Sequence, residues 1–145
     1  MTPDDARRLQ DGLAAWARIE PGCRALALVG SWVRGAARPD SDLDLMLLAT
    51  DRDHWAANDG WLRQVLREIG FASVTMAPET YGVTRAWRAS LGPQIEVEVG
   101  IADQQWAGLN PLDAGTQRVV RDGLKPLVDK DGLLRALVDA CDGEP

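Results

Sequence analysis

The sequence predicts an α/β fold: a single domain over residues 1–145 in which a small mixed β-sheet is flanked by helices. Apolar runs at 24–29 and 42–49 and an alternating run at 94–102 are typical of strands, and segments of helical periodicity separate them. A chain of this length can bury a sizeable core. The order of helices and strands favours one layered structure, with the helices expected on one side of the sheet.

The first predicted element is an amphipathic helix over 3–19. Thr2 can cap it, Pro3 suits its first position, and two acidic residues follow at the positive end of the helix dipole. Leucine, tryptophan and alanine then recur at helical spacing, and Pro21 with Gly22 ends the helix. The strands 24–29 and 42–49 come next in the chain.

The middle of the chain is predicted to contain one helical region and two strands. Residues 51–69 have a helical apolar stripe, with an interruption expected around 58–60. We expect a short strand over 71–76, a turn at 77–79 because of its proline, and a further strand over 81–90.

The clearest alternation in the sequence is I-E-V-E-V within 94–102. In a strand, Glu96 and Glu98 point to one face and the aliphatic residues to the other. The last predicted elements are a helix over 113–122, an extended segment over 125–129 and a helix over 131–140.

Composition and charge restrict the classes of function. The formal net charge of −6 argues against nucleic acid as a partner, because a sequence-independent grip on phosphates needs a basic face. Cys23 and Cys141 lie far apart without metal-ligand spacing, which fits a reducing compartment. The polar first residues do not resemble a signal peptide, and apolar runs are too short to span a bilayer. We therefore expect a cytoplasmic protein with no membrane partner.

Two features of the stretch 25–49, a pair of acids and a glycine-serine turn, indicate a site for a metal ion and phosphates. Asp42 and Asp44 alternate at the start of a strand, so they share a face, and two adjacent carboxylates call for a compensating divalent metal. Gly30 and Ser31 follow the preceding strand, where a glycine turn lets backbone N–H groups approach phosphates. Arg34, three residues further on, could add a guanidinium to the same phosphates.

A third carboxylate is available from the strand 94–102. If that strand lies beside 42–49, one of its glutamates can converge with Asp42 and Asp44. Three hard oxygen ligands suit Mg²⁺ or Mn²⁺ and a phosphoryl transfer. Alternation alone leaves Glu96 and Glu98 equivalent; we prefer Glu98, which lies deeper in the strand and close to Gly100.

The stretch GSWVRGAARPDSDLDL resembles the signature of nucleotidyltransferases of the DNA polymerase beta superfamily. It is most similar to small bacterial members: aminoglycoside-type adenylyltransferases and the minimal nucleotidyltransferases that pair with helical HEPN proteins. The resemblance covers residues 26–48 and, more loosely, 95–99. It implies the single-domain nucleotidyltransferase fold.

The resemblance also implies roles for individual residues. Asp42 and Asp44 would bind Mg²⁺ or Mn²⁺, and Glu98, with Glu96 as the alternative, would be the third metal ligand and the catalytic base. The expected nucleotide-binding residues are Gly30, Ser31, Arg34 and Ser41. The implied reaction moves a nucleoside monophosphate, AMP from ATP in the first instance, to a hydroxyl of a small molecule or protein and releases pyrophosphate.

Partners and competing interpretations remain open at this point. The chain has little room for a helical acceptor domain, so either a homodimer completes the acceptor site or a HEPN-type toxin is the acceptor and this chain its antitoxin. A catalytically silent nucleotide-binding module is the contrasting class. Trp32 and Trp87 are candidates for stacking on a base, although core positions are commoner. We expect Arg85 and Arg88 on a solvated face.

Overall fold

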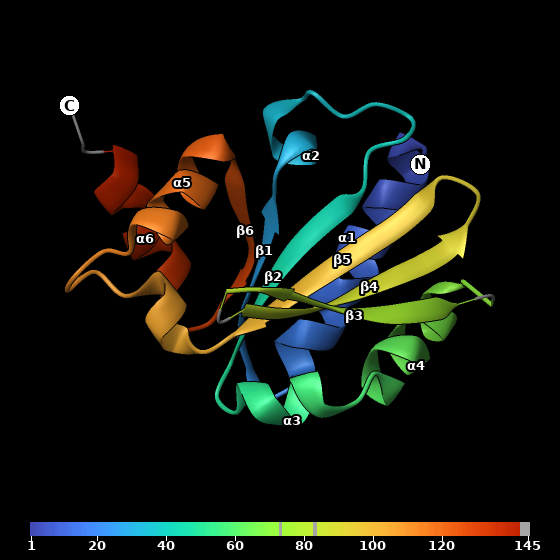
Figure 1. Cartoon of the computed structure of the whole chain (residues 1–145), viewed down its shortest axis with the longest axis horizontal. Helices are drawn as coiled ribbons and strands as arrows, with labels where there is room; N and C mark the ends of the chain where they lie inside the picture. The colour runs from blue at the N-terminus through green and yellow to red at the C-terminus, as the bar shows by residue number, and fades with distance from the viewer. Residues whose placement is uncertain (73, 83, 143–145) are drawn as a thin grey trace.

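A computed structural model describes residues 1–72, 74–82 and 84–142. Their strands form one six-stranded sheet in the order β3-β4-β5-β2-β1-β6 (Figure 1). β2 and β5 are parallel, and the other neighbouring strands are antiparallel. The predicted mixed α/β sheet is therefore confirmed, and it is consistent with the nucleotidyltransferase fold. The strands are β1 (Cys23–Val29), β2 (Leu43–Ala49), β3 (Thr75–Tyr81), β4 (Thr84–Gly92), β5 (Ile95–Ala102) and β6 (Leu124–Asp129).

The helices cover both faces of the sheet, so the expectation of helices on one side is wrong. In β1, Leu26 and Leu28 pack into the core under α1 and α4, whereas Ala25 and Ala27 pack into a second core with α6. A strand that is apolar on both faces needs cover on both. Figure 1 shows α5 and α6 beside β6. The helices are α1 (Pro3–Ile19), α2 (Ser31–Arg34), α3 (Arg52–Ala57), α4 (Gly60–Ile69), the 3₁₀ helix η1 (Gln104–Ala107), α5 (Ala114–Asp122) and α6 (Leu133–Asp142).

The segment before β4 differs from the sequence prediction. The strand expected over 71–76 is wrong in its bounds, because β3 begins at Thr75 and continues through the predicted turn at 77–79. Pro78 does not end this strand because β3 lies at the sheet edge, where a missing N–H costs no ladder hydrogen bond. Ser73, within the predicted strand, lies outside the described residues. The strand expected over 81–90 is divided between the end of β3 and most of β4.

Both edge strands contain a proline. Pro78 lies in β3 opposite Trp87 of β4, and Pro126 lies in β6 opposite Ala27 of β1. Each proline removes one backbone donor from an edge of the sheet.

Among the helices that the structure describes, none combines the length and the apolar character needed to cross a bilayer.

Candidate active site

The predicted acids converge because β2 and β5 are neighbours. In their parallel pairing, Asp44 lies opposite Glu98, and Leu43 lies opposite Val97. The leucine and the valine are fully buried in the core beneath the sheet. The side chains of Asp44 and Glu98 therefore point to the other face, where they meet Asp42 from the loop before β2.

A large cavity opens over this face of the sheet. Its volume is about 980 Å³, which lies at the upper end of the range for small-molecule sites. Asp42, Asp44 and Glu98 line it, whereas Glu96 does not. The floor is formed by small and flexible apolar residues, and the far wall comes from η1 and α5. Among these floor and wall residues are Met46, Gly100, Ala102, Trp106 and Val119.

Arg88 of β4 joins the acids into one network. Its Nη1 donates to Asp42 Oδ2 at 2.7 Å and to Glu96 Oε2 at 3.2 Å, and its Nη2 donates to Glu98 Oε2 at 2.6 Å. Glu79 lies 3.7 Å from its Nε. The hydrogen bond with Asp42 is the main reason why the pKa of the Arg88 guanidinium rises above its ordinary value. One cation thus contacts four carboxylates.

The expectation of a solvated face is wrong for Arg88 and right for Arg85, which is exposed. Successive residues of a strand point to opposite faces. Arg85 and Arg88 are three residues apart and therefore lie on opposite faces, so only Arg88 reaches the acids. Arg88 is opposite Glu98 in the antiparallel pairing of β4 with β5. The position of Arg88 beside the acids follows from this strand pairing, which the sequence alone did not predict.

Asp44 is the acid whose charge is least compensated. Within the described ranges, no hydrogen-bond donor meets its carboxylate. Burial raises the pKa of Asp44 to about 6, and the charges of Glu98 and Asp42 add to the rise.

The donor set fits a divalent ion in its chemistry. Carboxylate oxygens are hard ligands suited to Mg²⁺ or Mn²⁺, and the carboxylates around Arg88 and Asp44 outnumber the single guanidinium. Among residues 1–72, 74–82 and 84–142, no group of three or more His, Cys, Asp or Glu side chains is arranged so that it could hold a metal ion. The three expected ligands, Asp42, Asp44 and Glu98, therefore remain a prediction.

The Gly30–Ser31 turn lies directly beside the acids. Gly30 caps α2 with φ of +85°, and a Cβ at this position would lie 3.4 Å from Asp44 Oδ2. Its N–H donates to the Gly123 carbonyl oxygen, so this donor is already used within the fold. In the part of the chain that the structure describes, the Ser31 hydroxyl has no hydrogen-bond partner. Neither residue lines the cavity, although the preceding Val29 does.

Arg34 and Ser41 hold loops in this structure. Arg34 Nη1 donates to the carbonyl oxygen of Asp122, the last residue of α5, at 2.8 Å. The Ser41 hydroxyl accepts from the Arg38 N–H at 2.8 Å and closes the loop before Asp42. The structure does not bring either side chain to the cavity wall, and their expected contacts with nucleotide remain predictions.

The turn between α5 and β6 packs closely against the Gly30 turn, and Gly123 makes this close approach possible. Gly123 has φ of +127°, and a Cβ there would lie 3.1 Å from Val33 Cβ and 3.3 Å from the Gly30 carbonyl oxygen. Gly123→Ala is therefore expected to lower the free energy of unfolding by about 2–3 kcal/mol. Gly132 has φ of +73° and open space around it, so Gly132→Ala is expected to lower the free energy of unfolding only by the backbone strain, about 1 kcal/mol. Urea unfolding of both variants measures the difference; equal losses would contradict this close packing.

Two aromatic residues of the cavity were not predicted from the sequence. The Tyr81 hydroxyl donates to Glu98 Oε2 at 3.1 Å, and Trp106 of η1 lines the opposite wall. Trp32 and Trp87 pack against the core on the other face, which confirms the commoner of their two expected placements and not the stacking on a base. No local pattern predicted η1, so Trp106 carried no signal of its position.

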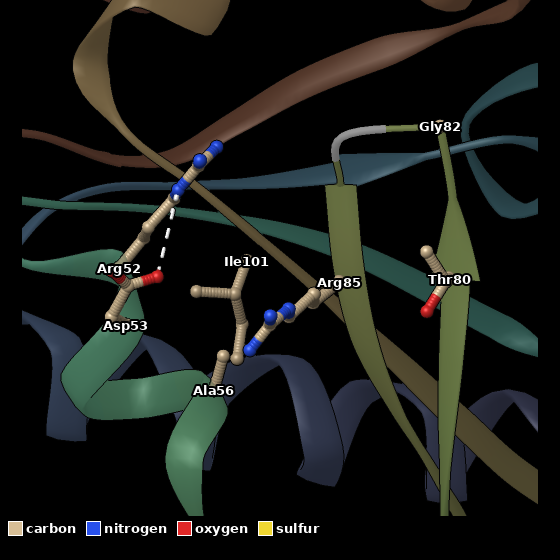
Figure 2. A pocket seen from close by; sticks show the side chains of 7 residues that line it. All are labelled: Arg52, Asp53, Ala56, Thr80, Gly82, Arg85 and Ile101. Atoms are coloured by element: carbon tan, nitrogen blue, oxygen red, sulfur yellow. Dashed lines mark ion pairs between the residues drawn. The ribbon is translucent and has the colours of Figure 1, made fainter.

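A smaller cavity of about 330 Å³ lies at the β3–β4 hairpin (Figure 2). It shares Arg52 and Gly82 with the large cavity, whereas Arg85 and Ile101 line it but not the large cavity. Figure 2 shows the Arg52 side chain directed away from the helix, with its Nε 3.9 Å from Asp53. None of the expected site residues lines it, whereas Asp42, Asp44 and Glu98 line the large cavity.

Comparison with known proteins gives distant likenesses in structure. No family model matches the chain, and no curated protein matches it. Terminal uridylyl transferase 4 from Trypanosoma brucei with bound UPU is similar at 19% identity and a TM-score of 0.43, over 65% of this chain and 32% of that one. A toxin-antitoxin crystal structure with AMP-PNP is similar at 15% identity and a TM-score of 0.45, over 92% and 83%. The chain thus spans about a third of the uridylyl transferase.

Proposed function

We propose that this protein is a metal-dependent nucleotidyltransferase. It transfers a nucleoside monophosphate, AMP from ATP in the first instance, to an acceptor hydroxyl and releases pyrophosphate. The observation that carries the proposal is the convergence of Asp44 and Glu98, from the paired strands β2 and β5, with Asp42, from the loop before β2, on the wall of one large cavity. The uncompensated charge of Asp44, beside a glycine turn, supports it further.

Asp42, Asp44 and Glu98 would hold Mg²⁺ or Mn²⁺. The ion, when bound, supplies charge neutralisation for the triphosphate and lowers the pKa of the acceptor hydroxyl. Glu98 is the proposed base, because it lines the cavity and already accepts a hydroxyl hydrogen bond. Glu96 is the alternative; it reaches Arg88 but not the cavity wall.

The triphosphate is proposed to lie against the glycine turn. Ser31 offers an unused hydroxyl there, and Gly30 keeps the space beside Asp44 free of a side chain. Arg34 is the last residue of α2 and Ser41 lies in the loop that leads from α2 to Asp42, and both are proposed to bind the same nucleotide. Phosphates would also give Arg88 an anionic partner in place of the carboxylates.

Calorimetry tests the proposal. Titration with a non-hydrolysable ATP analogue and Mg²⁺ is expected to give a binding isotherm with the wild-type chain. The double variant Asp42→Ala/Asp44→Ala is expected to give none. Asp40→Asn is the matched control, because its side chain is exposed and its one ion pair within the described part of the chain is with Arg38, at 3.6 Å. Identical null traces from wild type and the double variant would remove the basis of the proposal.

A protein partner and a second copy of this chain are the two proposed sources of an acceptor in another molecule. A HEPN-type protein partner would make the chain an antitoxin-like enzyme, and a homodimer could instead complete a small-molecule site. Co-purification from the native host distinguishes them: a helical partner carrying nucleotide supports the first, and a lone homodimer the second. Nucleotide binding without pyrophosphate release would identify a catalytically silent module.

A further inference from the structure

Tyr81 occupies a particular position in the candidate site. It is the last residue of β3, the edge strand, and its side chain crosses the face of β4 to reach β5. Its hydroxyl donates to Glu98 Oε2 at 3.1 Å, although half of the residue (51%) is exposed to solvent. It is the only tyrosine in the chain. A phenol therefore already lies where an acceptor hydroxyl is needed.

The other hydroxyls of the cavity wall do not share this arrangement. Thr116 is 2% exposed, and its hydroxyl donates to the Trp106 carbonyl oxygen at 2.9 Å. Thr84 lines the cavity, but no described acid accepts from its hydroxyl. Among the described residues that line the cavity, Tyr81 alone presents a hydroxyl to a carboxylate of the proposed catalytic group.

We propose that Tyr81 is itself a nucleotidylation site, so that the protein transfers a nucleoside monophosphate to its own phenol. This inference rests on the proposed function. It adds the acceptor class, a phenolic hydroxyl, and names the first acceptor that the site meets.

The step balances with the groups already assigned. Tyr81 Oη attacks the α-phosphorus and forms an O–P bond. The bond between the α-phosphorus and the bridging oxygen breaks, and pyrophosphate leaves with that electron pair. The phenolic proton passes to Glu98, which accepts the hydrogen bond beforehand. The product is a phosphodiester between Tyr81 and the nucleoside.

Mass spectrometry tests the inference on the full chain incubated with ATP and Mg²⁺. The expected product carries one nucleoside monophosphate, located on the peptide that contains Tyr81. Tyr81→Phe is expected to lose the modification completely. Thr80→Val is the matched control, because it removes a neighbouring hydroxyl that does not line the large cavity. This variant is expected to keep the modification. Because Tyr81 and Glu98 belong to one chain, the rate should not depend on protein concentration.

The outcomes separate this inference from the proposed function. Calorimetry of Tyr81→Phe with the ATP analogue and Mg²⁺ should show retained binding, since the variant keeps all expected ligands. A wild-type chain that binds nucleotide and leaves Tyr81 unmodified overturns the inference alone. Equal labelling of wild type and Tyr81→Phe does the same. A wild-type chain that binds no nucleotide overturns the proposed function and the inference together.

Discussion

Asp44→Asn is expected to slow nucleotidyl transfer strongly while making the folded protein more stable. The amide keeps the shape of the side chain but loses the charge that would hold the metal ion. We expect the rate of transfer to fall on the order of 10³-fold, as for the loss of a main electrostatic contact to a transition state. Pyrophosphate release, measured with saturating ATP and Mg²⁺, gives the rate.

The gain in stability follows from the raised pKa. Asp44 has a pKa of about 6 in the folded protein against 3.8 when unfolded, so the folded state binds its proton more tightly. Ionisation therefore costs stability as the pH rises from about 4 to about 6, and the cost is complete above that range. The shift corresponds to about 3 kcal/mol, which solvent screening reduces to about 1–2 kcal/mol.

Thermal unfolding of Asp44→Asn without divalent ions measures this effect. The variant should unfold at a higher temperature than wild type at pH 8, with the gain vanishing near pH 4. Asp40→Asn serves again as the control and should change neither activity nor stability. A variant less stable than wild type at pH 8 would show that the Asp44 charge is compensated after all.

Arg88→Ala is expected to cost the most stability of any substitution at the site. It would leave Asp42, Glu96 and Glu98 side by side without their shared cation. Removing one partner from a partly buried ionic network typically costs about 2–4 kcal/mol. Arg85→Ala on the same strand is the matched control, because Arg85 is exposed and has no ion pair among the described residues; its effect should lie within about 0.5 kcal/mol.

Denaturant unfolding at pH 7, with and without Mg²⁺, measures the Arg88 effect. Because a divalent ion can replace the lost positive charge, Mg²⁺ should recover a larger part of stability in Arg88→Ala than in wild type. Equal losses in the two arginine variants would mean that the network around Arg88 contributes little to folding.

Local sequence pattern was sufficient for the elements that hold the acids. The first helix was predicted with its observed bounds, and β1, β2 and β5 differ from their predicted ranges by one residue at most. Each has a strong apolar period that its surroundings do not override. That β2 and β5 are neighbours was assumed and not predicted, and their parallel pairing confirms the assumption.

Residues that reach the site from a distant strand could not be found in this way. Arg88 and Tyr81 meet Glu98 only because β3, β4 and β5 are paired, and a single sequence does not encode such pairing in any short window. β3 was misplaced because its proline resembles a turn signal. Glu96 and Glu98 share a face and both contact Arg88, and their catalytic roles remain to be measured.

The prolines at the two edges of the sheet have a consequence for association. An exposed edge strand is a template on which another chain can add a strand, and this is a common route to aggregation and to strand-exchange dimers. Pro78 and Pro126 each break the row of donors that such an added strand would need. A second copy or a partner is therefore expected to dock through side chains of the helices or the cavity rim, and the free protein should tolerate high concentration.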